Sequence, residues 1–489
     1  MKTTRTRKTV SFDAASADVY QSPLVGRNAS REMAELFSMR RRALTWRRIW
    51  LALAESQHEL GLPITSSQLR SLRGALDDIN LASAREHEVR LRHDVMAHLH
   101  AYGDVAPDAR GILHLGATSM DIVDNADLIL MREAMGVIRE WLVSAVEALA
   151  RRAKEFRDLP CLGFTHYQPA QLTTVGKRVS LWCVDFARDL EEIDGRIRTL
   201  RFRGIRGATG TQASFLALMK GNAAKVRKLE RLVAAKLGFD ECEPVVGQTY
   251  SRKIDAHVVS ALANIAAGAH KFANDLRLLA NLKEMEEPFG KSQIGSSAMA
   301  YKRNPMLCER ATGLARFVIS LAQSGFQNAA EQWLERTLDD SSNKRLLIPE
   351  AFLATDGILQ IVVQVARGFV VYPQVIAAHV EAELPFMATE DILMAAAAAG
   401  GDRQALHERI RVHSQAAAAE VKLKGRANDL LARLRRDEAF AGVKISELMR
   451  PDAFVGLAAK QVDEFLSRTI TPLLKRHHGV RRRDPEISV

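Results

Sequence analysis

The sequence predicts an all-α protein of three helical domains, of which the central one is a bundle of long helices. The chain has 489 residues, too many for one hydrophobic core. Its 29 glycines and 14 prolines are roughly 9 % of the residues, where about 12 % is usual. Apolar residues recur at helical spacing over segments of roughly 30 residues, about 45 Å of helix. Few turn-forming residues and long periodic segments together indicate a helical bundle.

The first predicted domain covers residues 20–118 and follows a basic N-terminal tail at residues 1–19. Ser30 is placed to cap a helix, because an apolar-periodic segment begins directly after it. Around Trp46 and Trp50 apolar residues again recur at helical spacing, until Gly, Leu and Pro end the segment. Short helices joined by loops therefore form a small α-domain.

The second predicted domain, residues 119–371, holds the long helices. One ends before Pro160, and the next begins directly after Pro169, since proline favours the first helical position. Helices of such length are typical of a bundle that continues across subunits. The predicted helices are residues 121–157, 170–200, 222–237, 253–285, 305–328 and 346–368.

The third predicted domain, residues 372–474, consists of shorter helices and is followed by a basic tail at residues 475–489. Gly400 and Gly401 interrupt this region, as does the segment around Pro385. No repeat with a period of 20–50 residues is visible, which argues against a solenoid.

Positive charge is concentrated at the two ends of the chain. The sequence has 69 Lys and Arg against 58 Asp and Glu, a formal net charge of +11. Residues 1–9 contain four cations and no acid, and residues 475–489 contain five cations against two acids. We expect both ends to be solvated, flexible tails. Because the remaining body is nearly balanced, the charge does not favour a nucleic-acid partner.

The composition favours a soluble, cytoplasmic protein. Its four cysteines are far apart and form no CxxC pair, which indicates neither a disulfide framework nor a thiolate zinc site. The N-terminal residues lack the continuous apolar core of a signal peptide. The most apolar runs, residues 358–371 and 392–399, are interrupted by polar side chains or too short to span a bilayer. No membrane partner is therefore expected.

Metal and phosphate-loop motifs are not found in the sequence. Four histidines cluster between residues 87 and 100, but they form no HExxH motif. Gly176-Lys177 lacks the preceding glycine and the following hydroxyl residue of a Walker loop. His93, which lies between Arg92 and Asp94, is better explained as a residue that faces a ligand.

Residues 295–306 form the most polar loop, which begins Gly-Ser-Ser-Ala-Met and ends Lys-Arg-Asn-Pro-Met. A loop with so many hydroxyls and cations offers little packing, so a ligand is the better explanation for it. Cations also recur at segment ends beside uncharged donors, as a site for carboxylates and phosphate requires. The cations are Arg27, Arg92, Lys302, Arg310, Arg336 and Arg345, and the donors are Thr118, Ser119, Gln248 and Ser341.

These segments resemble the fumarase/aspartase superfamily. Residues 295–299, followed by Lys302 and Asn304-Pro305, are similar to the signature loop of enzymes that eliminate fumarate from a succinyl group. Further blocks resemble, more narrowly, the adenylosuccinate lyase family in the form found in animals. These blocks are residues 92–98, 163–166, 168–178, 247–253, 278–289 and 335–341, in that order along the chain.

The resemblance implies a carbon–nitrogen lyase that uses neither a metal nor an organic cofactor. Its implied substrates are adenylosuccinate, which gives AMP and fumarate, and the succinylated aminoimidazole carboxamide ribotide (SAICAR), which gives the carboxamide (AICAR) and fumarate. Ser296 would be the base of this anti β-elimination, and His166 the acid that protonates the leaving nitrogen. Lys302 and loop amides would stabilise the ionised serine.

The resemblance also implies supporting residues. His93 would contact the nucleotide phosphate or assist the reaction, and Glu309 would orient His166. Two residues depart from the pattern: Ala300 replaces the usual proline of the signature, and Asn28 replaces a tyrosine. The implied substrate contacts are Arg27, Asn28, Arg92, Asp94, Thr118, Ser119, Gln248, Arg310, Arg336, Ser341 and Arg345.

Members of the superfamily are homotetramers in which three subunits build each site, so the resemblance implies the same assembly here. Three alternatives stay open. The chain could be another superfamily member, such as an argininosuccinate lyase or a cycloisomerase. It could be a structural homologue that has lost catalysis, or its basic tails could bind RNA.

Overall fold

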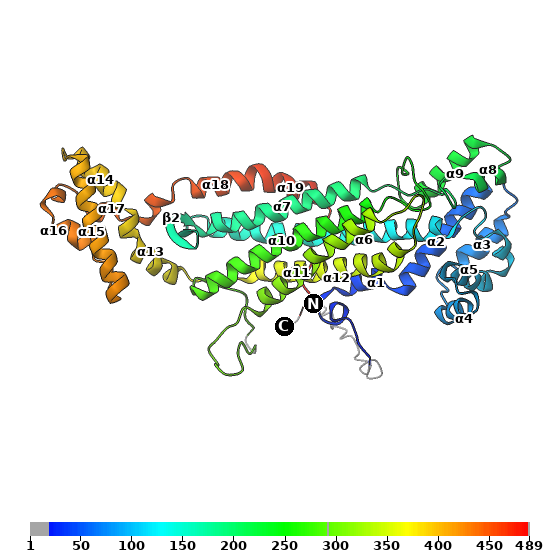
Figure 1. Cartoon of the computed structure of the whole chain (residues 1–489), viewed down its shortest axis with the longest axis horizontal. Helices are drawn as coiled ribbons and strands as arrows, with labels where there is room; N and C mark the ends of the chain where they lie inside the picture. Colours follow the sequence, from blue (N-terminus) through cyan, green and yellow to red (C-terminus); the bar gives the residue numbers. More distant parts are fainter. Residues whose placement is uncertain (1–18, 291–292, 488–489) are drawn as a thin grey trace, which may run out of the picture.

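The computed structural model describes residues 19–290 and 293–487, which form an elongated helical bundle (Figure 1). The short N-terminal helices gather at one end of the bundle, and helices from the C-terminal third gather at the other. Most of the predicted N-terminal tail, residues 1–18, lies outside the described residues.

Long helices run along the bundle. The helix α10 packs against α11, α11 packs against α12, and α6 packs against both α7 and α12. Their bounds lie close to the predicted ones, although α12 begins well before residue 346 and α10 ends before residue 285. The helices are α6 (Ser119–Glu155), α7 (Val175–Thr199), α9 (Ala223–Lys236), α10 (Lys253–Asn281), α11 (Met306–Ala330) and α12 (Asp339–Gly368), with the short α8 (Ala213–Leu218) before α9.

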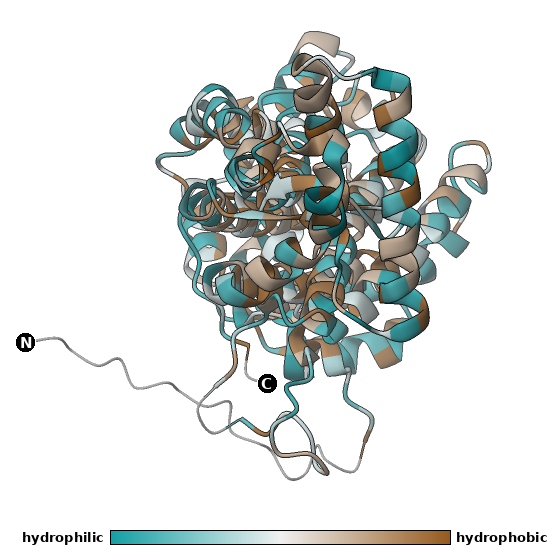
Figure 2. Ribbon diagram, turned by 90° about the vertical axis from the view of Figure 1, so that its left-hand side faces the viewer, coloured by the Kyte–Doolittle hydropathy of each residue, from teal (hydrophilic) through white to brown (hydrophobic). Residues whose placement is uncertain are grey.

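The long helices share one hydrophobic core. Viewed along the bundle, individual helices carry both hydrophilic and hydrophobic residues (Figure 2), as amphipathic helices do. Within the described part of the chain, α12 is the one helix long and apolar enough to cross a membrane, but 83 % of its most apolar window is buried. It is therefore a core helix of the bundle.

The N-terminal region consists of short helices, as predicted. Ser30 caps the first α-helix, since its side chain accepts a hydrogen bond from the Met33 amide at 3.3 Å. Trp46 and Trp50 are buried in the core. The elements are η2 (Leu24–Asn28), α1 (Arg31–Leu36), α2 (Met39–Glu59), α3 (Ser66–Gly74), α4 (Leu81–Leu91), α5 (Asp94–Val105) and η3 (Pro107–Ile112).

Two small antiparallel sheets depart from the predicted all-α class. The strands β1 (Pro160–Thr165) and β2 (Gln168–Thr174) form a hairpin, and β3 (Met285–Glu286) pairs with β4 (Val370–Val371). The prediction of a helix directly after Pro169 is therefore wrong. Pro169 lies within β2, and the helix is capped instead by Thr174, which accepts a hydrogen bond from the Lys177 amide at 3.1 Å.

The C-terminal helices do not form the single domain predicted for residues 372–474. A second apolar core joins residues between Ala388 and Ile445, but the last helices return to the main core and lie along α7 (Figure 1). The last helices join the main core through Val462, Ile470 and Leu473, whose side chains are buried there. The elements are α13 (Pro373–Met387), α14 (Thr389–Ala398), α15 (Arg403–Lys424), α16 (Leu430–Arg436), η4 (Glu438–Phe440), α17 (Ile445–Leu448), η5 (Pro451–Val455), α18 (Ala458–Phe465), η6 (Leu466–Ile470) and α19 (Thr471–Arg476).

The prediction of a solvated tail at residues 475–489 is also wrong for the part that the structure describes, which ends at residue 487. Arg481, Arg482 and Arg483 each form an ion pair with a glutamate of α1 or α6. Arg483 is only 4 % exposed. Carboxylates therefore pair with all three of these arginines, which are bound to the bundle rather than free in a tail.

A close contact between α6 and α7 yields a stability prediction. At Gly176 an added Cβ would meet the Arg157 amide nitrogen at 2.6 Å and the Ala153 carbonyl. Gly176→Ala should therefore lower the free energy of unfolding by about 2 kcal/mol, since backbone cannot move aside cheaply. Gly74→Ala is the matched control because nothing lies within 4 Å of its Cβ. Equal denaturation midpoints for the two variants would contradict the contact.

Candidate active site

Nine of the sequence-predicted site residues line one open cavity of about 700 Å³. It lies where the start of α5, the start of α6, the loop before α10 and the start of α12 meet. The nine residues are Arg92, His93, Asp94, Thr118, Ser119, Gln248, Arg336, Ser341 and Arg345.

His93 is held in a defined tautomer at the wall of the cavity. It caps α5, and its Nδ1 accepts a hydrogen bond from the Met96 amide at 3.4 Å. The ring proton of the neutral imidazole is therefore on Nε2, which lies 3.4 Å from the Ser119 hydroxyl. Arg92, in the left-handed conformation at φ 52°, ends the preceding helix and turns the chain toward this cap. His93 thus presents a hydrogen-bond donor to the cavity.

Two arginines of the segment from Arg336 to Arg345 also line the cavity. The Arg345 guanidinium pairs with Asp94 at 2.7 Å and is half exposed. Arg336 carries a buried Nη1 that has no hydrogen-bond partner within the described ranges. A buried guanidinium nitrogen without an acceptor is costly, so an anionic ligand would satisfy it.

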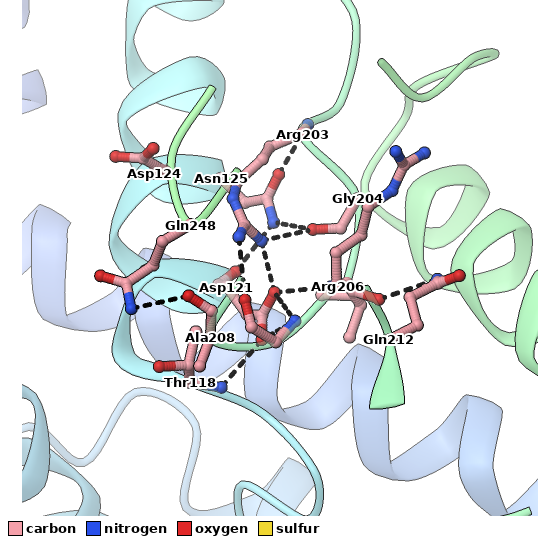
Figure 3. Close-up of polar contacts among 12 residues, drawn as sticks. Thr118, Asp121, Asp124, Asn125, Arg203, Gly204, Arg206, Ala208, Gln212 and Gln248 are labelled. Carbon is pink, nitrogen blue, oxygen red and sulfur yellow. Dashed lines mark hydrogen bonds and ion pairs between the residues drawn. The ribbon is translucent and has the colours of Figure 1, made fainter. Parts of the chain in front are cut away.

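A buried polar network lies beside Thr118 and Gln248 (Figure 3). Asp121 forms an ion pair with Arg203, and both side chains are fully buried. The Asp121 carboxylate also accepts hydrogen bonds from the amides of Thr118 at 2.8 Å and Arg206 at 2.7 Å. Gln248 donates to the Ala208 carbonyl at 3.0 Å. The network therefore fixes the loop at residues 203–208 against the first turn of α6.

Asp124, one helical turn further along α6, holds the loop before α10 and the start of α12, which form two other walls of the cavity. Its carboxylate pairs with Arg252 at 3.1 Å and with Lys344 at 3.1 Å, and it accepts the Tyr250 amide at 2.9 Å. Burial raises the pKa of this carboxyl, but the charges of Arg252, Lys344 and Arg203 outweigh burial and lower the pKa to about 2. Because Lys344 precedes Arg345, this pair also fixes the helix turn that carries the cavity arginine.

Sequence reasoning did not identify Asp121 and Asp124. A usable signal was present, because these acids and Asn125 interrupt the apolar residues of a helix that is otherwise a core helix. Polar groups at buried positions require partners, so they indicate a network.

The polar loop between α10 and α11 projects away from the bundle (Figure 1). The Ser296 hydroxyl accepts a hydrogen bond from the Met299 amide at 3.2 Å, and the Lys302 amide donates to the Met299 carbonyl at 3.0 Å. The base of the loop is closed by Glu287, which is 5 % exposed and accepts the amides of Leu307 at 3.0 Å and Cys308 at 2.9 Å. Ser296 and Lys302 therefore lie on a turn that is fixed at the base of the loop, where Glu287 contacts the start of α11.

Seven predicted site residues, Ser296 and Lys302 of this loop among them, do not line the cavity. His166 is exposed at the tip of the β1–β2 hairpin, and β2 lies toward the opposite end of the bundle from α5 (Figure 1). Glu309 is exposed in the first turn of α11. Burial lowers the pKa of Arg310, the charge of Arg27 lowers it further, and the charge of Glu287 raises it.

Asn28 has a structural environment in this chain. Its side chain is 9 % exposed and donates to the Pro23 carbonyl at 2.9 Å. Its backbone packs on Gly357, where an added Cβ would meet the Asn28 carbonyl oxygen at 3.0 Å. The amide thus secures the segment that carries Arg27.

Comparison with known proteins identifies the family. A family model described as "Lyase" matches residues 68–320, and one described as "Adenylosuccinate lyase C-terminus" matches residues 385–465. The adenylosuccinate lyase of Saccharomyces cerevisiae is 50 % identical over 463 residues, which is 94 % of this chain and 96 % of that protein. The chain belongs to the adenylosuccinate lyase family.

Other members of the adenylosuccinate lyase family are similar over nearly the whole chain. The enzyme of Schistosoma mansoni is 43 % identical over 459 residues, covering 93 % of this chain and 96 % of that protein. The enzyme of Pyrococcus abyssi is 30 % identical over 451 residues, covering 91 % of this chain and 97 % of that protein. As a member of the family, the chain is a carbon–nitrogen lyase, as the resemblance implied.

Solved structures confirm the superfamily fold. The 3-carboxy-cis,cis-muconate lactonizing enzyme of Pseudomonas putida has a TM-score of 0.79 at 21 % identity and covers 93 % of this chain and 99 % of that one. The fumarate lyase of Mesorhizobium sp. BNC1 has a TM-score of 0.76 at 24 % identity, and the match covers 92 % of this chain and 99 % of that one. At these identities the likeness shows the fold alone.

The Asp124 ion pairs predict a specific loss of stability in acid. The pKa of about 2 in the folded state lies below the ordinary 3.8, so this carboxylate stabilises the fold above about pH 4. That contribution, about 2 kcal/mol, is lost as the pH falls toward 2. In urea unfolding, the stability difference between Asp124→Asn and the unsubstituted protein should therefore shrink between pH 4 and pH 2.5.

The control for this titration is Asp452→Asn. Asp452 also forms an ion pair, with Arg450, but its side chain is 62 % exposed. A solvated pair contributes little, so this variant should follow the unsubstituted protein at every pH. A stability difference for Asp124→Asn that does not change with pH would show that the buried carboxyl does not titrate as described.

Proposed function

We propose that the protein eliminates fumarate from adenylosuccinate, giving AMP, and from SAICAR, giving AICAR. The observation that carries this proposal is the single cavity shared by His93, Ser119, Gln248, Arg336 and Arg345. A phosphorylated substrate with two carboxylates needs cations and neutral donors together, and this cavity has both. The name of the relatives at 50 % identity supports the same substrate.

In the proposed reaction, residues of three regions have different roles. Ser296, once ionised, takes the proton from the succinyl carbon, and His166 donates a proton to the leaving nitrogen. Lys302 and the Met299 amide, which already donates to the Ser296 hydroxyl, stabilise the alkoxide. Glu309 orients His166, while Arg27 and Arg310 hold an anionic group of the substrate. Each step needs only proton transfer and charge stabilisation, so the proposal includes no metal and no organic cofactor.

We further propose that these regions meet across subunits of a homotetramer. Within one chain the cavity, the Ser296 loop and the His166 hairpin belong to separate parts of the bundle. Large apolar side chains on α11 and in the loop before α12 are exposed in the single chain, as expected of surfaces that bury on association. They include Phe317, Phe326, Trp333, Leu334 and Leu338.

Two finer assignments are also proposals. The sequence blocks are proposed to be of the type found in animals; the Schistosoma mansoni enzyme is 43 % identical, and the fungal enzymes of Saccharomyces cerevisiae and Schizosaccharomyces pombe are 50 % identical. The four free cysteines, of which Cys161, Cys183 and Cys308 are buried, support a reducing, cytoplasmic setting.

Absorbance of the purified protein with adenylosuccinate tests the proposed reaction, because conversion to AMP changes the ultraviolet spectrum of the purine. The unsubstituted protein should convert both substrates, and Ser296→Ala should lower kcat by at least about 100-fold. Ser297→Ala is the matched control on the same loop. A folded protein that leaves adenylosuccinate unchanged would indicate a homologue without catalysis, and normal turnover by Ser296→Ala would exclude this serine as the base.

Mixing inactive variants tests the shared site. His93→Ala and Ser296→Ala should each be inactive alone. After the two are dissociated, mixed and reassembled, some sites will combine an intact His93 with an intact Ser296, so part of the activity should return. Activity that stays absent in reassembled mixed tetramers would place both residues in one subunit's site.

A further inference from the structure

The C-terminal segment at residues 480–487 lies across α1, α6 and α12. His477 fixes its start, since its ring contacts Asp194 at 2.6 Å and is 6 % exposed. Further on, Asp484 pairs with Arg367 at 2.7 Å, and Arg367 also donates to the Arg483 carbonyl at 2.8 Å. The segment is therefore bound at several points along its length rather than by one contact.

Arg483 is the principal anchor of this segment. Its guanidinium pairs with Glu32 of α1 at 2.7 Å and with Glu140 of α6 at 2.8 Å. It lies 5.3 Å from the centre of the Trp141 ring, and the Arg483 amide donates to the Ser144 hydroxyl at 2.9 Å. A buried guanidinium with two carboxylate partners and an aromatic face holds α1 against α6.

Gln360, a fully buried residue of α12, connects the C-terminal segment to the N-terminal one. Its side-chain oxygen accepts the Glu486 amide at 3.0 Å, and its side-chain nitrogen donates to the Asn28 carbonyl at 3.0 Å. One turn earlier on α12, Asp356 accepts the Ser30 amide at 2.5 Å and the Ser30 hydroxyl at 3.1 Å. Asn28 and Ser30 are thus both held by one face of α12.

We propose that residues 480–487 act as a positioning strap that holds the segment from Pro23 to Ser30, and with it Arg27, in place for substrate. This rests on the proposed function, in which Arg27 binds an anionic group. Arg27 is exposed and lies in η2, directly before the buried Asn28 whose carbonyl α12 holds. Fixing that backbone beforehand reduces the entropy lost when substrate binds.

Arg483→Met tests the strap, and Arg481→Met is the matched control. Arg481 pairs with the same Glu32 at 3.2 Å, but its side chain is 63 % exposed. Loss of the buried anchor should raise KM for adenylosuccinate about tenfold while kcat stays within about twofold, since binding is weakened and the reacting groups are untouched. The control should change neither constant. An unchanged KM in a folded Arg483→Met protein would overturn the proposal.

Combination with Arg27→Ala shows whether the strap acts through Arg27. If it does, adding Arg483→Met to Arg27→Ala should raise KM no further, because the positioned side chain is already gone. KM increases that multiply would mean that the strap acts elsewhere and would overturn the proposal. If Arg27→Ala alone leaves KM unchanged, the substrate role of Arg27 fails instead, and hydrogen exchange then decides whether the strap holds the segment.

Hydrogen exchange measures the strap without reference to activity. Residues 20–34 should exchange at least about tenfold faster in Arg483→Met than in the unsubstituted protein, while α10 stays unchanged. Should Arg483→Met fail to fold, removal of residues 485–489 keeps Arg483 and takes away the Glu486 contact and the core packing of Ile487. The same faster exchange and higher KM are expected from that truncation. Unchanged exchange in residues 20–34 would overturn the strap.

Discussion

The cavity depends on charges that can be buried only as a group. Arg203 and Arg252 have no exposed side-chain surface, and each pairs with a carboxylate of α6. Burying one such charge without its partner costs several kcal/mol, so neither loop can dock on α6 alone without a large penalty. Because the same carboxylates accept loop amides, the ion pairs also set the backbone positions of Thr118 and Tyr250. Correct docking of the loops and formation of the cavity are therefore one event.

The helix α12 extends this constraint along the bundle. Near its start, Asp340 pairs with Arg252 at 2.5 Å and Lys344 pairs with Asp124. Further along, Asp356 and Gln360 hold the segment that carries Arg27. From residue 345 to residue 360 a helix rises roughly 22 Å, a distance that a packed helix keeps fixed. In the proposed assembly, this rigidity would set the spacing between the cavity and the neighbouring site to which Arg27 contributes.

The sequence predicts the regular parts of the fold and the chemical types at the site, and it fails where tertiary contacts decide. Helical periodicity locates α6, α9 and α11 to within a few residues because burial dictates that period. Pro169 misleads, since strand pairing with Phe164 overrides a local helix-start signal. The C-terminal arginines look like a solvated tail because their glutamate partners are more than 300 residues away. The network under the cavity is missed for the same reason: the Asp121–Arg203 pair joins residues far apart in the chain.

The Ser296 loop is weakly packed, but the proposed reaction requires it to hold the base in position. Its base is fixed where Glu287 accepts two amides at the start of α11, so the carboxylate acts on the helix as a cap would. Gly295 allows the tight turn that follows, because an added Cβ would meet Phe289 at 3.0 Å and the Lys302 carbonyl. That turn directs the Met299 amide at the Ser296 oxygen. The donor that shapes the loop would also stabilise the serine alkoxide, so the backbone geometry that positions the proposed base also favours its ionised form.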